Sequence, residues 1–247
     1  MDITFWVLII FVIIILAIIW ITKQVVRTLF FASAIILIVL IGFGFLVLSD
    51  VKDIRNNFPN TPSTFLLTKD NTVISGIIGK FGEEFSPDLL TDAQLTSIQE
   101  NFAEKNYEAI KGDNFKLIII NKSSFDQITV YDPDLQLTKD SIFSLLESEE
   151  PINDYITLQL GEGYSQAQFD IARQSFLRQA NITQESQFKS IMFGILLAQT
   201  LQEEPLFVFQ GFIDEKVIFY PETTAFKALK FLPESMLDSF VIVEGEK

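Results

Sequence analysis

The chain has 247 residues, a formal net charge of −14 at pH 7, and neither histidine nor cysteine. These counts exclude disulfides, thiolate chemistry and any catalytic triad that uses histidine as its base. The acidic balance repels nucleic-acid phosphates, so we expect no nucleic-acid partner.

Two uncharged apolar segments, residues 3–21 and 28–48, come first in the chain. As helices that rise about 1.5 Å per residue, both are long enough to cross a hydrocarbon core of about 30 Å. A cleaved signal peptide is a poorer interpretation, because the start is not basic and the first segment is too long. We therefore predict a transmembrane hairpin over residues 1–49, an integral membrane protein, and the lipid bilayer as a partner.

The orientation of this hairpin is nearly balanced under the rule that cytoplasmic loops are rich in lysine and arginine. Two basic residues lie between the segments and two lie just after them: Lys23, Arg27, Lys52 and Arg55. Acidic residues dilute the positive charge at the two ends, which favours an extracytoplasmic C-terminal domain. The sequons at Asn121 and Asn181 would be accessible to a glycosylating host there, and their use stays open.

The rest of the chain is predicted to form a short stalk, residues 50–63, and one acidic α+β domain, residues 64–247, with a mixed or antiparallel sheet covered by helices. The predicted strands are residues 64–68, 72–78, 116–120, 128–131, 155–160, 206–210, 216–220 and 240–244. The predicted helices cover about 92–105, 139–147, 166–180, 184–203 and 224–231. The order helix, strand, strand, helix, strand recurs over 91–160 and 183–244, which raises the hypothesis of two related halves.

Neighbouring strands are expected to form two hairpins. The first joins residues 64–68 to 72–78 across a polar turn, and the second joins 206–210 to 216–220. The apolar segment 190–201 is too short to cross a membrane. We predict that it is a central helix buried under the sheet.

Helix starts are marked by four residues with hydroxyl side chains, which are predicted N-caps: Thr91, Thr138, Ser165 and Thr183. Gln94, three residues after Thr91, completes a capping-box pattern. Ser165 also lies in the stretch GYSQA, which approaches the G-x-S-x-G elbow of hydrolases. Without histidine the remaining base is a lysine, Lys139 or Lys189, and no spacing selects either. The cap is the preferred interpretation of Ser165.

Acidic residues are the remaining candidates for chemistry. Asp132 and Asp134 follow a predicted strand, where two carboxylates can hold Mg²⁺ or Ca²⁺. The intervening proline makes an ordinary turn the preferred interpretation, so no cofactor is expected. Five glutamates at predicted helix ends offer paired carboxylates for acid–base chemistry, although exposed helix ends are commoner: Glu147, Glu149, Glu150, Glu203 and Glu204.

The leading functional hypothesis is a membrane-anchored interaction or assembly protein, which binds other membrane proteins or another copy of itself. The alternative is a membrane-tethered hydrolase or transferase that uses carboxylates, with Mg²⁺ or Ca²⁺. A small-ligand sensor is a third hypothesis. Four phenylalanines near the second hairpin are either core residues or a partner-binding surface: Phe207, Phe209, Phe212 and Phe219.

Overall fold

The structure is a computed structural model that describes residues 31, 33, 35–38, 42, 57, 60–80, 87–129, 131, 132, 137–204, 206–223, 226 and 227. The chain divides into two compact units, Met1–Ser49 and Asp50–Lys247. No helix within the described residues is long and apolar enough to cross a membrane. The predicted segment 3–21 lies outside the described residues, and 28–48 is described only in part.

A mixed sheet of five strands forms the centre of the second unit, in the order β3-β2-β1-β4-β7. Its strands are β1 Ser63–Lys69, β2 Thr72–Gly79, β3 Asp88–Leu89, β4 Leu117–Asn121 and β7 Val217–Tyr220. β1 and β4 are parallel, whereas the pairs β1/β2, β2/β3 and β4/β7 are antiparallel. The prediction of an α+β domain with a mixed sheet and helices is confirmed.

The β1/β2 hairpin follows from its turn chemistry. Asp70 and Asn71 have φ angles of 48° and 64°. Such positive angles match the right-handed twist of the flanking strands, and short polar side chains tolerate them. A register shift between Leu67 and Thr68 bends β1 near this turn.

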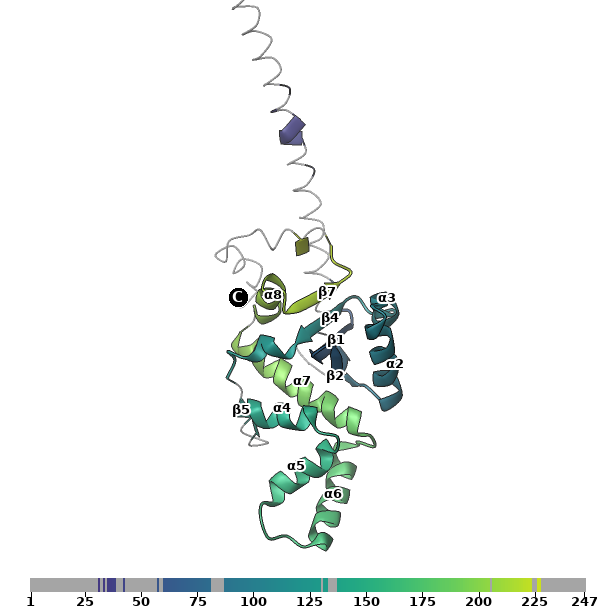
Figure 1. Ribbon diagram of the computed structural model, residues 1–247, viewed down its shortest axis with the longest axis vertical. Helices are drawn as coiled ribbons and strands as arrows, with labels where there is room; N and C mark the ends of the chain where they lie inside the picture. Colours follow the sequence, from purple (N-terminus) through teal and green to yellow (C-terminus); the bar gives the residue numbers. More distant parts are fainter. Residues whose placement is uncertain are drawn as a thin grey trace, which may run out of the picture. The chain divides into compact units, whose positions relative to one another are not determined.

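Helices cover both faces of the sheet (Figure 1). On one face Leu66 and Ile119 pack with α2 Asp92–Ala103 and α3 Tyr107–Lys111. On the other face Phe65 and Ile118 pack with α4 Lys139–Glu147, α7 Glu185–Glu203 and α8 Phe207–Ile213. Because successive strand residues point to opposite faces, one apolar strand supplies both cores.

Helix α7 is the central helix that segment 190–201 predicts. Phe193, Leu196 and Leu197 are fully buried. The hydroxyl of Ser190 donates to the carbonyl oxygen of Gly76 at 2.7 Å and accepts the N–H of Leu90 at 3.2 Å. These bonds fix α7 against β2 and the segment after β3, and they satisfy backbone groups that have no contact with water.

Residues 155–160 are helical, so the predicted strand there is wrong. They belong to α5 Pro151–Leu160, which begins with proline in its first turn and ends at Gly161 with a φ of 72°. Ile152, Tyr155 and Ile156 are buried, which is the i, i+3, i+4 spacing of a helix face. The β-branched and aromatic composition of this run is overridden by its helix start and its tertiary packing.

Residues 207–210 are also helical, so the second predicted hairpin is wrong. Phe207, Val208, Gly211 and Phe212 in α8 are buried together, and β7 pairs with β4 instead. A run of five residues, four of them apolar, is too short to reveal its period. With both strands replaced by helices, the described residues do not show the predicted element order, and the hypothesis of two related halves stays a prediction from the sequence.

Smaller differences concern the ends of elements. The predicted strand 128–131 is reduced to the two-residue strand β5 Tyr131–Asp132, which pairs with β6 Leu137–Thr138. Helix α7 begins after Gln184, which is its N-cap, so the cap predicted at Thr183 is wrong by one residue. Segment 240–244 and most of 224–231 lie outside the described residues.

Helices α5 and α6 Gln166–Ala180 form an antiparallel hairpin that projects beyond α4 and α7 (Figure 1). We call residues 151–180 the helical arm. Rings of Tyr155, Phe176 and Phe188 lie 5.1 to 5.8 Å apart and join α5, α6 and α7 at its base. Asn181 ends α6 in the left-handed conformation.

Candidate functional site

Ser165 is the N-cap of α6. Its hydroxyl accepts the N–H of Gln168 at 3.4 Å, and the Gln168 side chain accepts the N–H of Ser165 at 2.8 Å. This is a complete capping box. Thr91 and Thr138 cap α2 and α4 through side-chain oxygens in the same way.

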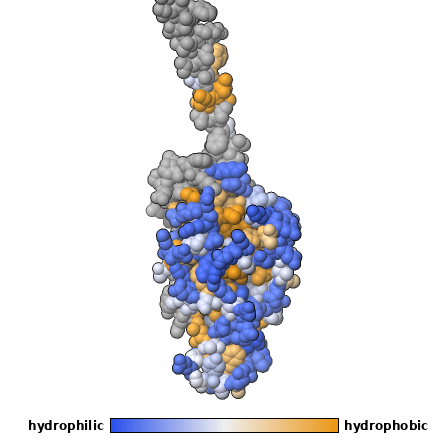
Figure 2. All heavy atoms as spheres, viewed as in Figure 1, coloured by the Kyte–Doolittle hydropathy of each residue, from blue (hydrophilic) through white to orange (hydrophobic). Residues whose placement is uncertain are grey.

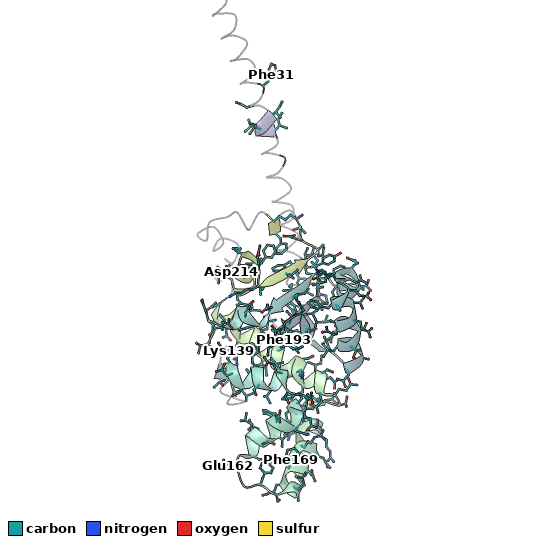
Figure 3. The ribbon with its side chains drawn as sticks, in the orientation of Figure 1. Phe31, Lys139, Glu162, Phe169, Phe193 and Asp214 are labelled. Atoms are coloured by element: carbon teal, nitrogen blue, oxygen red, sulfur yellow. The ribbon has the colours of Figure 1, made fainter. Side chains whose placement is uncertain are left out.

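Within the described residues, the hydroxyl of Ser165 makes its hydrogen bonds to Gln168 and to neither candidate lysine. The ammonium of Lys139 donates to the carbonyl oxygens of Phe125 and Asp126, both at 3.0 Å. Figure 3 places Lys139 far from Glu162, which lies in the turn just before Ser165. Lys189 lies in α7, where burial lowers the pKa of its ammonium group.

The predicted metal pair is only partly described. Asp132 lies in β5, and Asp134 lies outside the described residues. Within the part of the chain that the structure describes, no group of three acidic side chains is arranged to hold a metal ion. The Mg²⁺ or Ca²⁺ site therefore stays a prediction from the sequence.

The phenylalanines near β7 belong to the core. Phe207, Phe212 and Phe219 are at most 4% exposed. Phe209 and Phe219 stack with a centroid distance of 6.0 Å, and Phe219 also stacks on Phe226 at 4.2 Å. The three buried rings are therefore not a partner-binding surface, and Phe209 is partly buried against the same core.

Glu147, one of the predicted acid–base candidates, is held by lysines. Its Oε2 lies 2.8 Å from the ammonium of Lys69 at the end of β1, and its Oε1 accepts from Lys122 just after β4. These hydrogen bonds, first from Lys122 and then from Lys69, lower the pKa of the Glu147 carboxyl. We call Lys69, Lys122 and Glu147 the lysine clamp.

An open cleft of about 650 Å³ adjoins the lysine clamp. It is lined by Lys122, Phe125, Asp126, Lys139, Asp140, Phe143, Ser144 and Glu147. The ammonium of Lys122 also lies 4.9 Å from the centre of the Phe143 ring, a cation–π contact that restricts its position. The parallel strands β1 and β4 end beside this cleft, and ligands of sheets with parallel strands commonly bind at such ends.

The helical arm is the second candidate site. None of the 15 residues of α6 is buried, and Ile171 is 70% exposed. Leu158, in α5, is 53% exposed. Figure 2 shows apolar side chains among polar ones at this end of the domain. These two aliphatic side chains would become part of an interaction surface if they formed one contiguous apolar patch.

Comparison with known proteins adds no family to these observations: no family model, curated protein or solved structure matches the chain. The sequence indicated Glu147 as a candidate but not its lysine partners, and it did not indicate the arm as a site. Lys69 and Glu147 are 78 positions apart, so no local pattern connects them. The arm had a visible signal, because the segment 166–180 is polar for a helix that must pack.

Proposed function

We propose that this chain is a membrane-anchored interaction protein whose helical arm binds a second copy of the same chain. The observation that carries the proposal is the exposure of Ile171, at 70%, in a helix with no buried residue. The opposite side of α6 already packs on the domain through Phe176 and Leu177. Ile171 and Leu158 are therefore the apolar side chains of the arm that remain for a partner.

Charge favours a second copy as that partner. The arm has three acidic residues and two arginines, a net charge of −1, whereas the whole chain carries −14: Asp154, Glu162, Asp170, Arg173 and Arg178. Two acidic domains repel each other least where each is nearly neutral. The hairpin carries both acidic and basic residues, which also suits a twofold interface, because there the same surface patch of the two copies is in contact. Two hairpins together supply the four helices of a common packing unit.

Membrane anchoring is the second part of the proposal, and the apolar segments 3–21 and 28–48 support it. The described residues of the second segment are helical, and their large apolar side chains are 56–68% exposed: Phe31, Ile35, Ile36, Leu37 and Ile38. Side chains of this kind suit contact with lipid. Attachment to one bilayer raises the effective concentration of two arms, with the domain on the extracytoplasmic side.

The test is the molar mass of the full chain in mild detergent, measured by light scattering during size-exclusion chromatography. We expect a dimer for the wild type and a monomer for Ile171→Glu, because the new carboxylate would be buried in the interface. Ile218→Glu is the matched control, since Ile218 is 42% exposed in β7, outside the arm, and should stay dimeric. A monomeric wild type, or a dimer that persists in Ile171→Glu, contradicts the proposal.

The hydrolase or transferase alternative has no specific observation in its favour among the described residues. A small-ligand sensor would use the cleft beside the lysine clamp. The carboxylate of Glu147 is held by two lysines, which keeps it ionised and makes it a poor proton donor. Both hypotheses stay predictions from the sequence.

A further inference from the structure

We propose that the cleft beside the lysine clamp is an anion-binding site, in which Lys69 and Lys122 hold a phosphate or carboxylate group and Glu147 is an internal competitor. The two ammonium groups come from different elements and each contacts a different oxygen of one carboxylate. A small oxyanion offers the same pair of oxygens. This inference is independent of the proposed function.

Glu147 is suited to being displaced. It is the last residue of α4, whose final turn contains no basic residue, so its charge lies at the negative end of the helix dipole. Its side chain is 28% exposed and can move into water without unfolding the helix. Each ion pair that water reaches changes the equilibrium between bound and displaced Glu147 by a factor of about one to five. Glu147 therefore competes only weakly with an incoming anion.

The cleft gives the bound group further contacts. Lys122 is positioned by the ring of Phe143, and Ser144 supplies a hydroxyl on the lining. Lys139 also lines the cleft, although its ammonium is bound to the carbonyl groups of Phe125 and Asp126. These groups surround a space large enough for more than a bare ion.

The charges that face the cleft are nearly balanced. Asp126, Asp140 and Glu147 oppose Lys122 and Lys139, and Lys69 reaches the site through Glu147. Three lysines thus meet three carboxylates in a chain that carries −14 overall. When Glu147 turns away, three lysines face the two remaining carboxylates, so the cleft presents a net charge of about +1 to an incoming oxyanion.

The test is calorimetric titration of the full chain in mild detergent with inorganic phosphate, at ionic strength held constant with sodium chloride. Glu147→Gln removes the competitor, so we expect it to bind phosphate up to about 25-fold more tightly than the wild type. Adding Lys122→Met to Glu147→Gln should abolish binding, and so should adding Lys69→Met. Lys105→Met, which changes an exposed lysine at the end of α2, is the matched control and should have no effect.

Two outcomes would overturn the site. One is the absence of phosphate binding in Glu147→Gln. The other is an equal weakening by Lys105→Met and Lys122→Met, which would mean diffuse attraction to surface lysines. Circular dichroism of each variant checks that the domain is folded, and the use of two separate lysine variants keeps the test decisive if one of them fails to fold.

Discussion

The sheet and the helical arm bury their residues to very different extents. Phe65, Leu66 and Leu67 in β1 are fully buried, whereas α6 contains no buried residue. The sheet is covered by helices on both faces, so its side chains are used for stability. The arm is attached at its base through the buried residues of α5, and it leaves Leu158 and Ile171 exposed, so these two side chains are available for binding at little cost in folding energy.

The largest expected effect is at the joint between these regions. Phe188 is fully buried and contacts the rings of Tyr155 and Phe176. Phe188→Ala should lower the free energy of unfolding by about 3–5 kcal/mol, measured with urea, because it leaves a cavity at the joint. The comparison is Gln174→Ala at an exposed position of α6, which should change the free energy of unfolding by less than about 0.5 kcal/mol. Similar losses of unfolding free energy for the two variants would contradict the distinction between the buried joint and the exposed arm.

An intermediate effect is expected at the start of α6. Ser165→Ala should cost about 1 kcal/mol because it removes the hydroxyl of the capping box. Ser165→Asp should recover most of that loss, since a carboxylate also caps a helix. Thermal unfolding of the three proteins measures this series. A loss that Ser165→Asp does not reduce would mean that the serine does something other than capping.

The smallest effect concerns the lysine clamp and its dependence on pH. The pKa of Glu147 is lowered in the folded protein from an ordinary value of 4.5. Its ion pairs therefore contribute stability that is complete above pH 4.5 and is lost as the pH falls through the lowered pKa. The contribution is expected to be below about 1 kcal/mol, because water reaches the pairs.

Urea unfolding of the wild type and Glu147→Gln between pH 7 and pH 3 measures this contribution. We expect the difference in unfolding free energy to shrink at the acidic end. In a Lys69→Met, Lys122→Met background the difference should vanish at every pH. A difference that grows as the pH falls would contradict the lowered pKa of Glu147 in the folded protein.

Local signals predicted the sheet and the helix starts, and failed where packing decided between helix and strand. The β1/β2 hairpin was predictable because Asp70 and Asn71 suit a turn with positive φ angles. The caps at Thr91, Thr138 and Ser165 were predictable because they depend on residues three positions apart. By contrast, α5 and α8 contain β-forming residues that became helical through their contacts with the rest of the core.

The candidate sites were less predictable than the fold. The lysine clamp joins the end of β1 to the end of α4, and only the topology of the sheet brings them together. The exposure of Ile171 depends on how the arm leaves the domain, which no periodic pattern in α6 records. The sequence motifs that resembled known sites, at Ser165 and at Asp132, concern short segments and carried no information about such long-range arrangements.

The parallel pairing of β1 with β4 has a consequence for synthesis of the chain. The hydroxyl of Thr68 in β1 bonds to the carbonyl oxygen of Ile120 in β4 across 52 positions, and Ser190 reaches Gly76 across 114. At about 5–20 residues per second, β1 waits roughly 3–10 s on the ribosome before its parallel neighbour exists. During that interval an apolar strand edge is open to other nascent chains, so the rate of translation between these strands helps to set the yield of folded protein.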